Sequence, residues 1–301
     1  MLDGAPPGGL GERLLALRGF SLLAALPAAE LALVARLSRE RDLSPGETLA
    51  VEGESVQTVR LIVSGQVTLS RAGRPMPGVG ALETVGLLAL AAGLPHPFTA
   101  VAADAVHALE IDAELVAEVL EDDFGLFARV LQLGANAALA ATARATPRDL
   151  AADAGRWGKQ RTTIAGSPRP ALPPIDVAET LLALRATTWF RAVPLDALAA
   201  LAKRLELVQL RTGAELAAPN GAGDLLLLVA GRARTAAGEL APGAALGVLE
   251  TLADTSPPMP LRALSPVQLL RASASDLFDV LEDHPAMGRA LLAEMLRVIA
   301  G

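Results

Sequence analysis

The chain has 301 residues, 52% of them hydrophobic, and this length predicts two domains that each bury a core of their own. A net charge of −7 and an aromatic content of 3% argue against nucleic-acid binding, which needs clustered cations and rings that stack on bases. The absence of cysteine excludes disulfides, thiolate zinc sites and cysteine nucleophiles, and it fits a reducing compartment.

The N-terminal residues show no basic segment followed by an apolar stretch, so no export signal is expected. The longest apolar run without a polar residue, Val85 to Leu94, has about half the length that a bilayer-spanning helix requires. We therefore expect a soluble protein in the cytoplasm.

A repeated pattern opens both halves of the chain. Glu12–Arg18 (ERLLALR) recurs as Glu179–Arg185 (ETLLALR), and each copy is followed by an amphipathic helix that starts at a proline, Pro27 or Pro194. The two helices share one apolar spacing. It is carried by Leu31, Val34, Ala35 and Leu37 in the first half and by Leu198, Leu201, Ala202 and Leu205 in the second.

Glycines at similar spacings then align a predicted pair of strands in the first half with a predicted pair in the second half. Gly46 and Gly65 are 19 residues apart and Gly213 and Gly231 are 18 apart, as expected for two strands and a turn with one residue deleted. The continuous apolar run Leu225–Val229 predicts a strand covered on both faces. In the first half, Val59, Leu61 and Val63 show partial alternation with Arg60, Ile62 and Ser64.

Residues 85–102 (VGLLALAAGLPHPFTAVA) predict a short helix, a Gly/Pro turn and a strand. Each half ends alike, because Leu120-Glu-Asp122 matches Leu281-Glu-Asp283 and a helix follows both, the second beginning at Pro285. The two halves are therefore predicted to share one fold, mainly β with α (α+β).

A basic segment, residues 142–176, separates the predicted domains 1–141 and 177–301. Its cations are Arg144, Arg148, Arg156, Lys159, Arg161 and Arg169. Two interpretations remain open, a solvated tether or a docking arm for an acidic partner. The lone Trp157 is the residue that supports docking.

The order of elements in both halves resembles the cyclic nucleotide-binding domain, present in tandem over about residues 12–140 and 179–299. The segments LSPGETLAVEGESVQTVRLIVSGQV and PVQLLRASASDLFDVLEDHPAMGRALL resemble that family most. The resemblance implies two jelly-roll-like β-rolls, each flanked by N-terminal and C-terminal helices. In the family the roll binds a cyclic nucleotide, and the helices transmit the signal that the nucleotide has bound.

The resemblance also implies a binding cassette in each copy. A glycine opens a short helix whose N–H groups face the phosphate, a glutamate accepts from the ribose hydroxyl, and an arginine binds the cyclic phosphate. In the first copy Gly86 matches the glycine, Leu87 replaces the glutamate and His96 stands in the arginine's place. Leu88 follows in the same short helix, and Thr99 matches a strand position that can contact the base.

In the second copy Gly247 matches the glycine, Val248 replaces the glutamate, and Leu249 follows. Pro257 or Pro258 stands in the arginine's place. A charge-assisted hydrogen bond contributes about 1.5–3 kcal/mol, and an arginine fork makes two of them. Cyclic nucleotide is therefore not expected to bind either copy.

Other constellations favour structural interpretations. The three histidines show no metal-binding spacing and are expected at the surface or at helix starts, and no cofactor or metal is expected. Glu121-Asp122-Asp123 is interpreted as a solvated helix end. The apolar group Leu87, Leu88, Leu90, Leu94 and Phe98 either fills its own pocket or accepts an apolar ligand. No catalytic arrangement is visible, so an enzyme is not expected.

The hypothesis that follows is a regulatory or scaffolding protein that binds another protein or itself, with no nucleic-acid or membrane partner. Its partner faces are expected on the closing helices, about Leu115–Ala140 and Asp276–Ile299. The alternative is a ligand-gated sensor whose first copy binds a cyclic nucleotide or a related metabolite through Gly86, Leu88, His96 and Thr99. A third hypothesis is transcriptional control through the basic segment.

Overall fold

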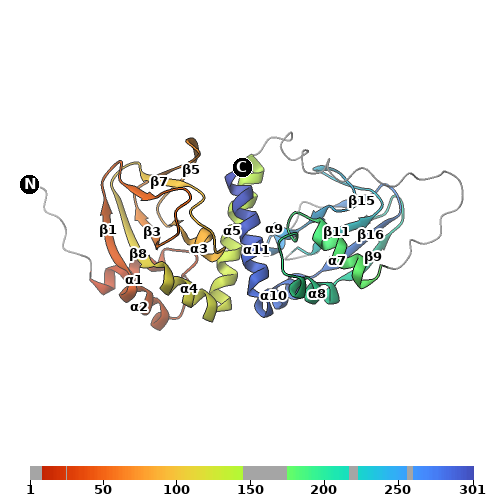
Figure 1. The fold of residues 1–301 in the computed structure, drawn as a ribbon, viewed down its shortest axis with the longest axis horizontal. Helices are drawn as coiled ribbons and strands as arrows, with labels where there is room; N and C mark the ends of the chain where they lie inside the picture. The colour runs from red at the N-terminus through yellow and green to blue at the C-terminus, as the bar shows by residue number, and fades with distance from the viewer. Residues whose placement is uncertain (1–8, 25, 145–174, 217–222, 256–259) are drawn as a thin grey trace, which may run out of the picture. The chain divides into compact units, whose positions relative to one another are not determined.

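A computed structural model describes residues 9–24, 26–144, 175–216, 223–255 and 260–301 (Figure 1). The chain divides into two compact units, the first ending at Gly134 and including Ala300–Gly301, the second running from Ala135 to Ile299. Residues 145–174, the greater part of the predicted linker, lie outside the described residues. The predicted domain boundaries at 141/142 and 176/177 stay predictions.

The first unit begins with two helices. They are α1 (Leu10–Arg18) and α2 (Ala28–Leu37), and Pro27 is the N-cap of α2, as the sequence predicts. Arg13 ties the two helices together because its guanidinium donates to the carbonyls of Ala35 (3.1 Å) and Ser38 (2.8 Å).

Eight short antiparallel strands form the β-roll of the first unit. They are β1 (Arg39–Leu43), β2 (Thr48–Ala50), β3 (Thr58–Ser64), β4 (Val67–Arg71), β5 (Arg74–Val79), β6 (Thr84–Val85), β7 (Thr99–Ala102) and β8 (Val106–Asp112). Two four-stranded sheets result, in the orders β1-β8-β3-β6 and β2-β7-β4-β5. Small and branched side chains from both sheets, including Ile62, Val67, Ala100 and Ala108, form the core of the roll.

Strand β3 is buried on both faces, and this differs from the partial alternation seen in its sequence. Val59 and Leu61 lie on the face that lines a cavity beside the helices, whereas Ile62 is fully buried in the core of the roll. Ile62 follows Leu61 directly and points to the opposite face, as alternation along a strand requires, and the pairing register with β8 shifts only after it, between Ile62 and Ser64. Ile62 is therefore a core residue.

Three helices complete this part of the chain: α3 (Leu87–Ala91), α4 (Ala113–Asp122) and α5 (Phe124–Arg144), the last extending past the end of the first unit. Helices α1, α2 and α4 lie together at one end of the strands (Figure 1). Asp112 caps α4, because its carboxylate accepts from the backbone N–H of Glu114 at 2.9 Å. The helix–turn–strand predicted for residues 85–102 is confirmed by α3 and β7.

Among the described helices, α5 alone has the length and mean hydropathy of a membrane-spanning segment. Core helices of soluble proteins have the same composition, and 39% of the apolar window of α5 is buried inside the structure. Leu126, Phe127 and Val130 on α5 are buried. The expectation that the protein has no membrane partner stays a prediction.

The second unit repeats this architecture. Its helices are α7 (Val177–Ala186), α8 (Leu195–Arg204), α9 (Val248–Leu252), α10 (Ala274–Asp283) and α11 (Pro285–Ala300). Its strands are β9 (Glu206–Leu210), β10 (Glu215–Leu216), β11 (Leu225–Ala230), β12 (Ala233–Thr235), β13 (Gly238–Leu240), β14 (Ala245–Leu246), β15 (Leu261–Ala263) and β16 (Val267–Ala272). The sheet orders β14-β11-β16-β9 and β10-β15-β12-β13 correspond strand for strand to those of the first unit. The predicted α+β fold with one architecture in both halves is confirmed.

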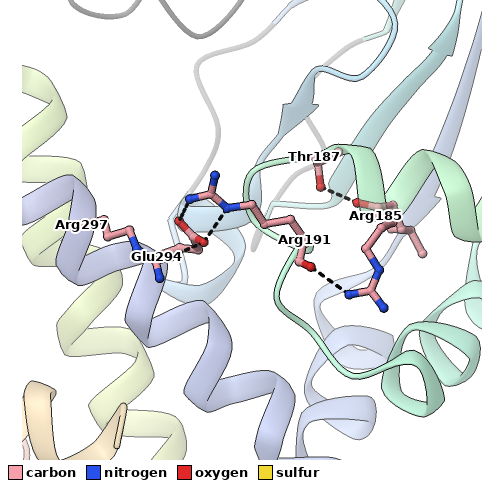
Figure 2. A network of polar contacts seen from close by, with 6 residues as sticks. Arg185, Thr187, Arg191, Glu294 and Arg297 are labelled. Atoms are coloured by element: carbon pink, nitrogen blue, oxygen red, sulfur yellow. Dashed lines mark hydrogen bonds and ion pairs between the residues drawn. The ribbon is translucent and has the colours of Figure 1, made fainter. Parts of the chain in front are cut away.

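A polar network fastens α11 within the second unit (Figure 2). Glu294 on α11 accepts two hydrogen bonds from Arg191, at 3.1 and 3.2 Å, and is also paired with Arg297 one turn further along the helix. Arg185 supports the segment that carries Arg191 by donating to the carbonyls of Arg191 (2.8 Å) and Val193 (2.7 Å). The Glu294 side chain is 3% exposed, whereas those of Arg191 and Arg297 are 55% and 54% exposed.

Candidate functional site

The candidate cassette of the first copy begins at Gly86, which precedes α3. Gly86 has a φ of +93°, and a Cβ at this position would lie 3.2 Å from Cε1 of His96 and 3.2 Å from the carbonyl oxygen of Thr58. The structure therefore brings together the two residues that the sequence places at the glycine and arginine positions of the cassette. The imidazole packs directly against the glycine.

His96 is buried, with 7% of its surface exposed, so the expectation of a surface or helix-start histidine is wrong for this residue. Its backbone N–H donates to the carbonyl of Glu54 at 2.9 Å, and its carbonyl accepts from the N–H of Gly53 at 2.9 Å. Burial lowers the pKa of His96, the positive charge of Arg60 lowers it further, and Glu54 acts in the opposite direction. The imidazole is therefore neutral at pH 7.

This lowered pKa predicts a pH dependence of stability. Below a pH of about 6.5, the unfolded chain binds a proton at His96 that the folded chain does not take up. The contribution of His96 to the free energy of unfolding should therefore fall as the pH drops below that value, and it should level off below the folded pKa. Above a pH of about 7.5 both states are neutral, so no dependence is expected there.

The test is chemical unfolding of the wild type and of His96→Gln between about pH 5 and pH 8. The difference in unfolding free energy between the two proteins should shrink or reverse on acidification, because the variant has no imidazole to titrate. A difference that stays constant over the whole range would contradict the assignment of a neutral, buried imidazole.

The side chains of the other predicted residues of the first cassette are buried or hydrogen-bonded within the protein. Leu87 is 4% exposed and faces an apolar cavity, and Leu88 is partly buried. The hydroxyl of Thr99, on β7, accepts from the backbone N–H of Glu52 at 3.1 Å. Of the leucine-rich group around α3, Leu94 is 37% exposed.

The cassette of the second copy is closer packed. A Cβ on Gly247, whose φ is +78°, would lie 2.2 Å from the carbonyl oxygen of Asp224. Val248 and Leu249 are both buried. The hydroxyl of Thr251, on α9, donates to the carbonyl of Gly223 at 2.7 Å. The predicted replacements for the arginine, Pro257 and Pro258, lie outside the described residues.

A comparison with protein families identifies the β-roll of the first unit. Residues 40–123 match the model of the cyclic nucleotide-binding domain. This part of the chain belongs to that family. No curated protein matches the chain.

Several solved structures are similar to the chain at low identity. The regulatory domain of Toxoplasma gondii PKA with cAMP is 14% identical, with 96% of this chain and 97% of that chain covered and a TM-score of 0.34. The regulatory subunit of a cAMP-independent protein kinase A from Trypanosoma cruzi, bound to guanosine, is 16% identical over 95% and 94% of the chains, with a TM-score of 0.34. A cAMP-binding acyltransferase from Mycobacterium smegmatis is 24% identical over 44% and 42%, with a TM-score of 0.37.

Within the cyclic nucleotide-binding domain, sequence reasoning missed Arg60. This residue lies on β3 and its charge acts on His96, yet its guanidinium is already engaged. Its Nε donates to Glu110 Oε1 at 2.8 Å, and a terminal nitrogen donates to the carbonyl of Leu49. The signal that could have found it is the single charged residue in the strand TVRLIVS.

The equivalent position of the second roll holds the opposite arrangement of charges. Leu226 replaces Arg60 in the pairing, and the cation is Arg271 on the neighbouring strand β16. Its guanidinium binds the carboxylate of Asp224, with Nε 2.7 Å from Oδ2. The glycine of this cassette thus lies beside a residue that carries an anion.

The described residues contain no group of three or more His, Asp or Glu side chains placed to hold a metal ion. Of the other two histidines, His107 lies on β8 with Nδ1 2.7 Å from Asp42 Oδ1, and His284 lies at the C-terminal end of α10. Both are partly exposed. The first cassette therefore places a neutral imidazole beside Gly86 with Arg60 nearby, whereas in the second cassette Gly247 lies beside Asp224, which is paired with Arg271.

Proposed function

We propose that this chain is a non-catalytic regulatory or scaffolding protein that acts by binding another protein or itself, and that its two cassettes do not bind cyclic nucleotide. The proposal includes the predicted cytoplasmic location and the absence of nucleic-acid and membrane partners.

The observation that carries the proposal is the uncharged state of the first cassette. Leu87 supplies no acceptor for a ribose hydroxyl, and His96 is neutral and packed against Gly86. Replacing a fork of two charge-assisted hydrogen bonds by a neutral ring removes about 3 kcal/mol or more from phosphate binding. A ligand phosphate would lose its hydration and gain too little in return.

Exposed apolar residues on the N-terminal helices support a role in protein binding. Leu15 on α1 is 75% exposed, and Leu182, which matches it in the repeat, is 70% exposed on α7. Leu10 and Val177 match in the same way and are also exposed. Exposed apolar side chains that gather in a patch mark protein-interaction sites, and we propose that these residues belong to such a patch in each unit. The closing helices stay predicted as further partner faces.

A second candidate function, a ligand-gated sensor, is favoured by the presence of Arg60 near His96. If Arg60 exchanged Glu110 for a ligand phosphate, the cassette would regain a cation. Such an exchange would leave the Glu110 carboxylate, which is 23% exposed, without its present partner. This cost is the reason that the scaffold is preferred.

Calorimetric titration of the full chain with cyclic AMP and cyclic GMP tests the proposal. No heat above dilution is expected for the wild type. His96→Arg restores the missing cation beside Gly86 and should gain binding by at least tens-fold. His107→Arg, the same change at a partly exposed histidine of β8, is the matched control. Sub-millimolar binding to the wild type that disappears in His96→Ala would instead establish the sensor.

A further inference from the structure

The first unit contains an apolar cavity next to the cassette. Its volume is about 70 Å³, and every lining side chain is a leucine, valine or isoleucine. The walls come from the segment after α1, from α2, α3, α4 and α5, and from β3 and β8. Leu87 of the cassette is one of the lining residues, so the cavity joins the cassette helix to the closing helices of the same unit.

The residues of the second unit that match the cavity-lining residues differ from them in size. The spacing from Arg18 to Pro27 equals the spacing from the matching Arg185 to Pro194, so the residues between them can be paired one to one. Within them, the cavity residues Leu22 and Leu23 correspond to Trp189 and Phe190. Phe190 is fully buried. At the position of Leu23 the second unit therefore buries a larger, aromatic side chain.

The rim of the cavity differs between the units as well. Leu37, the last residue of α2, and Leu115, the third residue of α4, line the cavity. At the matching positions the second unit has Arg204 and Asp276, whose side chains lie 3.6 Å apart, and Arg204 also binds Asp279 at 2.6 Å. In the first unit Leu37 and Val119 are 36% and 37% exposed, so the cavity opens under an apolar rim.

We propose that this cavity is a binding site for the alkyl end of a small apolar ligand. An unfilled apolar void loses contacts on its lining and does not hold water, so its occupant has to be apolar. An engineered cavity of about 150 Å³ binds benzene, and the smaller volume here suits a short alkyl group. The wholly aliphatic lining offers no hydrogen bond, so a polar head group would remain in water at the rim. The site goes beyond the proposed function and does not depend on the cassettes.

Straight-chain alkanols from butanol to octanol are the probes, and methyl NMR spectra of the full chain are the readout. Saturable shifts are expected for the methyl groups of Leu115 and Val130. The affinity should rise about fourfold with each added methylene until the cavity is filled. Leu23→Phe, which introduces the residue of the second unit, should abolish these shifts. Leu33→Phe makes the same change at a leucine of α2 that is 53% exposed and does not line the cavity, and it should bind as the wild type does.

A second variant covers the case in which Leu23→Phe fails to fold. Leu37→Arg combined with Leu115→Asp reproduces the rim of the second unit at partly exposed positions and should weaken alkanol binding at least tenfold. The proposal is overturned if no alkanol gives saturable shifts, if the shifts persist in both variants, or if affinity does not depend on chain length. Binding of a protein partner at this rim without any alkanol binding would overturn it too.

Discussion

Gly247→Ala should destabilise the second unit by on the order of 4 kcal/mol or more, enough to unfold it at physiological temperature. The new Cβ would lie 2.2 Å from the carbonyl oxygen of Asp224, an approach that no rotamer change can relieve because the obstructing atom is backbone. The residue also has a φ of +78°, which adds strain for any side chain. Calorimetric unfolding of the full chain measures the loss.

Gly243→Ala is the matched control for this prediction. Gly243 has a φ of +95°, yet a Cβ added there would have no atom of the described residues within 4 Å beyond its own chain neighbours. It should therefore show the conformational cost alone, about 1–2 kcal/mol. Equal losses in the two variants would mean that the close approach between Gly247 and Asp224 does not exist in solution.

Removing both arginines around Glu294, in Arg191→Ala combined with Arg297→Ala, should cost about 3–5 kcal/mol. The carboxylate is 3% exposed and would be left without a cation, whereas both guanidinium groups are more than half exposed and lose little when unpaired (Figure 2). Urea unfolding monitored by far-ultraviolet circular dichroism gives the change.

Glu294→Leu separates this explanation from a general loss of contacts. It removes the buried charge and leaves two arginines that water can solvate, so it should cost less than about 1 kcal/mol. Adding Glu294→Leu to the double arginine variant should restore most of the stability. If the triple variant is no more stable than the double, the buried carboxylate is not the cause.

Periodicity and the repeat predicted helix starts, a buried strand and the likeness of the two halves, because these signals depend on which face of an element is buried, whereas the β-roll was implied by the family resemblance. Pro27, Pro194 and Pro285 start helices where expected. Leu225–Leu228 are buried on both faces of β11, as their continuous apolar run predicts. The partial alternation of β3 did not show that both of its faces are covered, because burial of the Ile62 face depends on the other sheet of the roll.

The candidate site was less predictable. The resemblance to the cyclic nucleotide-binding domain placed Gly86 and His96 in one cassette, and the structure brings these two residues close together. It could not show that His96 is buried, because that depends on Glu54 and Gly53 from a distant loop. Arg60 was missed for the same reason, since its influence on His96 is set by strand pairing. Glu294 stands in a helix rich in leucine and methionine, where nothing nearby in sequence indicates its partner Arg191.

The opposite placement of charges in the two rolls has a consequence for folding. Chains with similar domains in tandem are prone to misassembly, in which a strand of one copy inserts into the other. Here β16 in the place of β8 would put Arg271 opposite Arg60, and β8 in the place of β16 would bring Glu110 next to Asp224. Each wrong partner meets a like charge in a partly buried position, so the sequence that makes the two copies similar also keeps their strands from being exchanged.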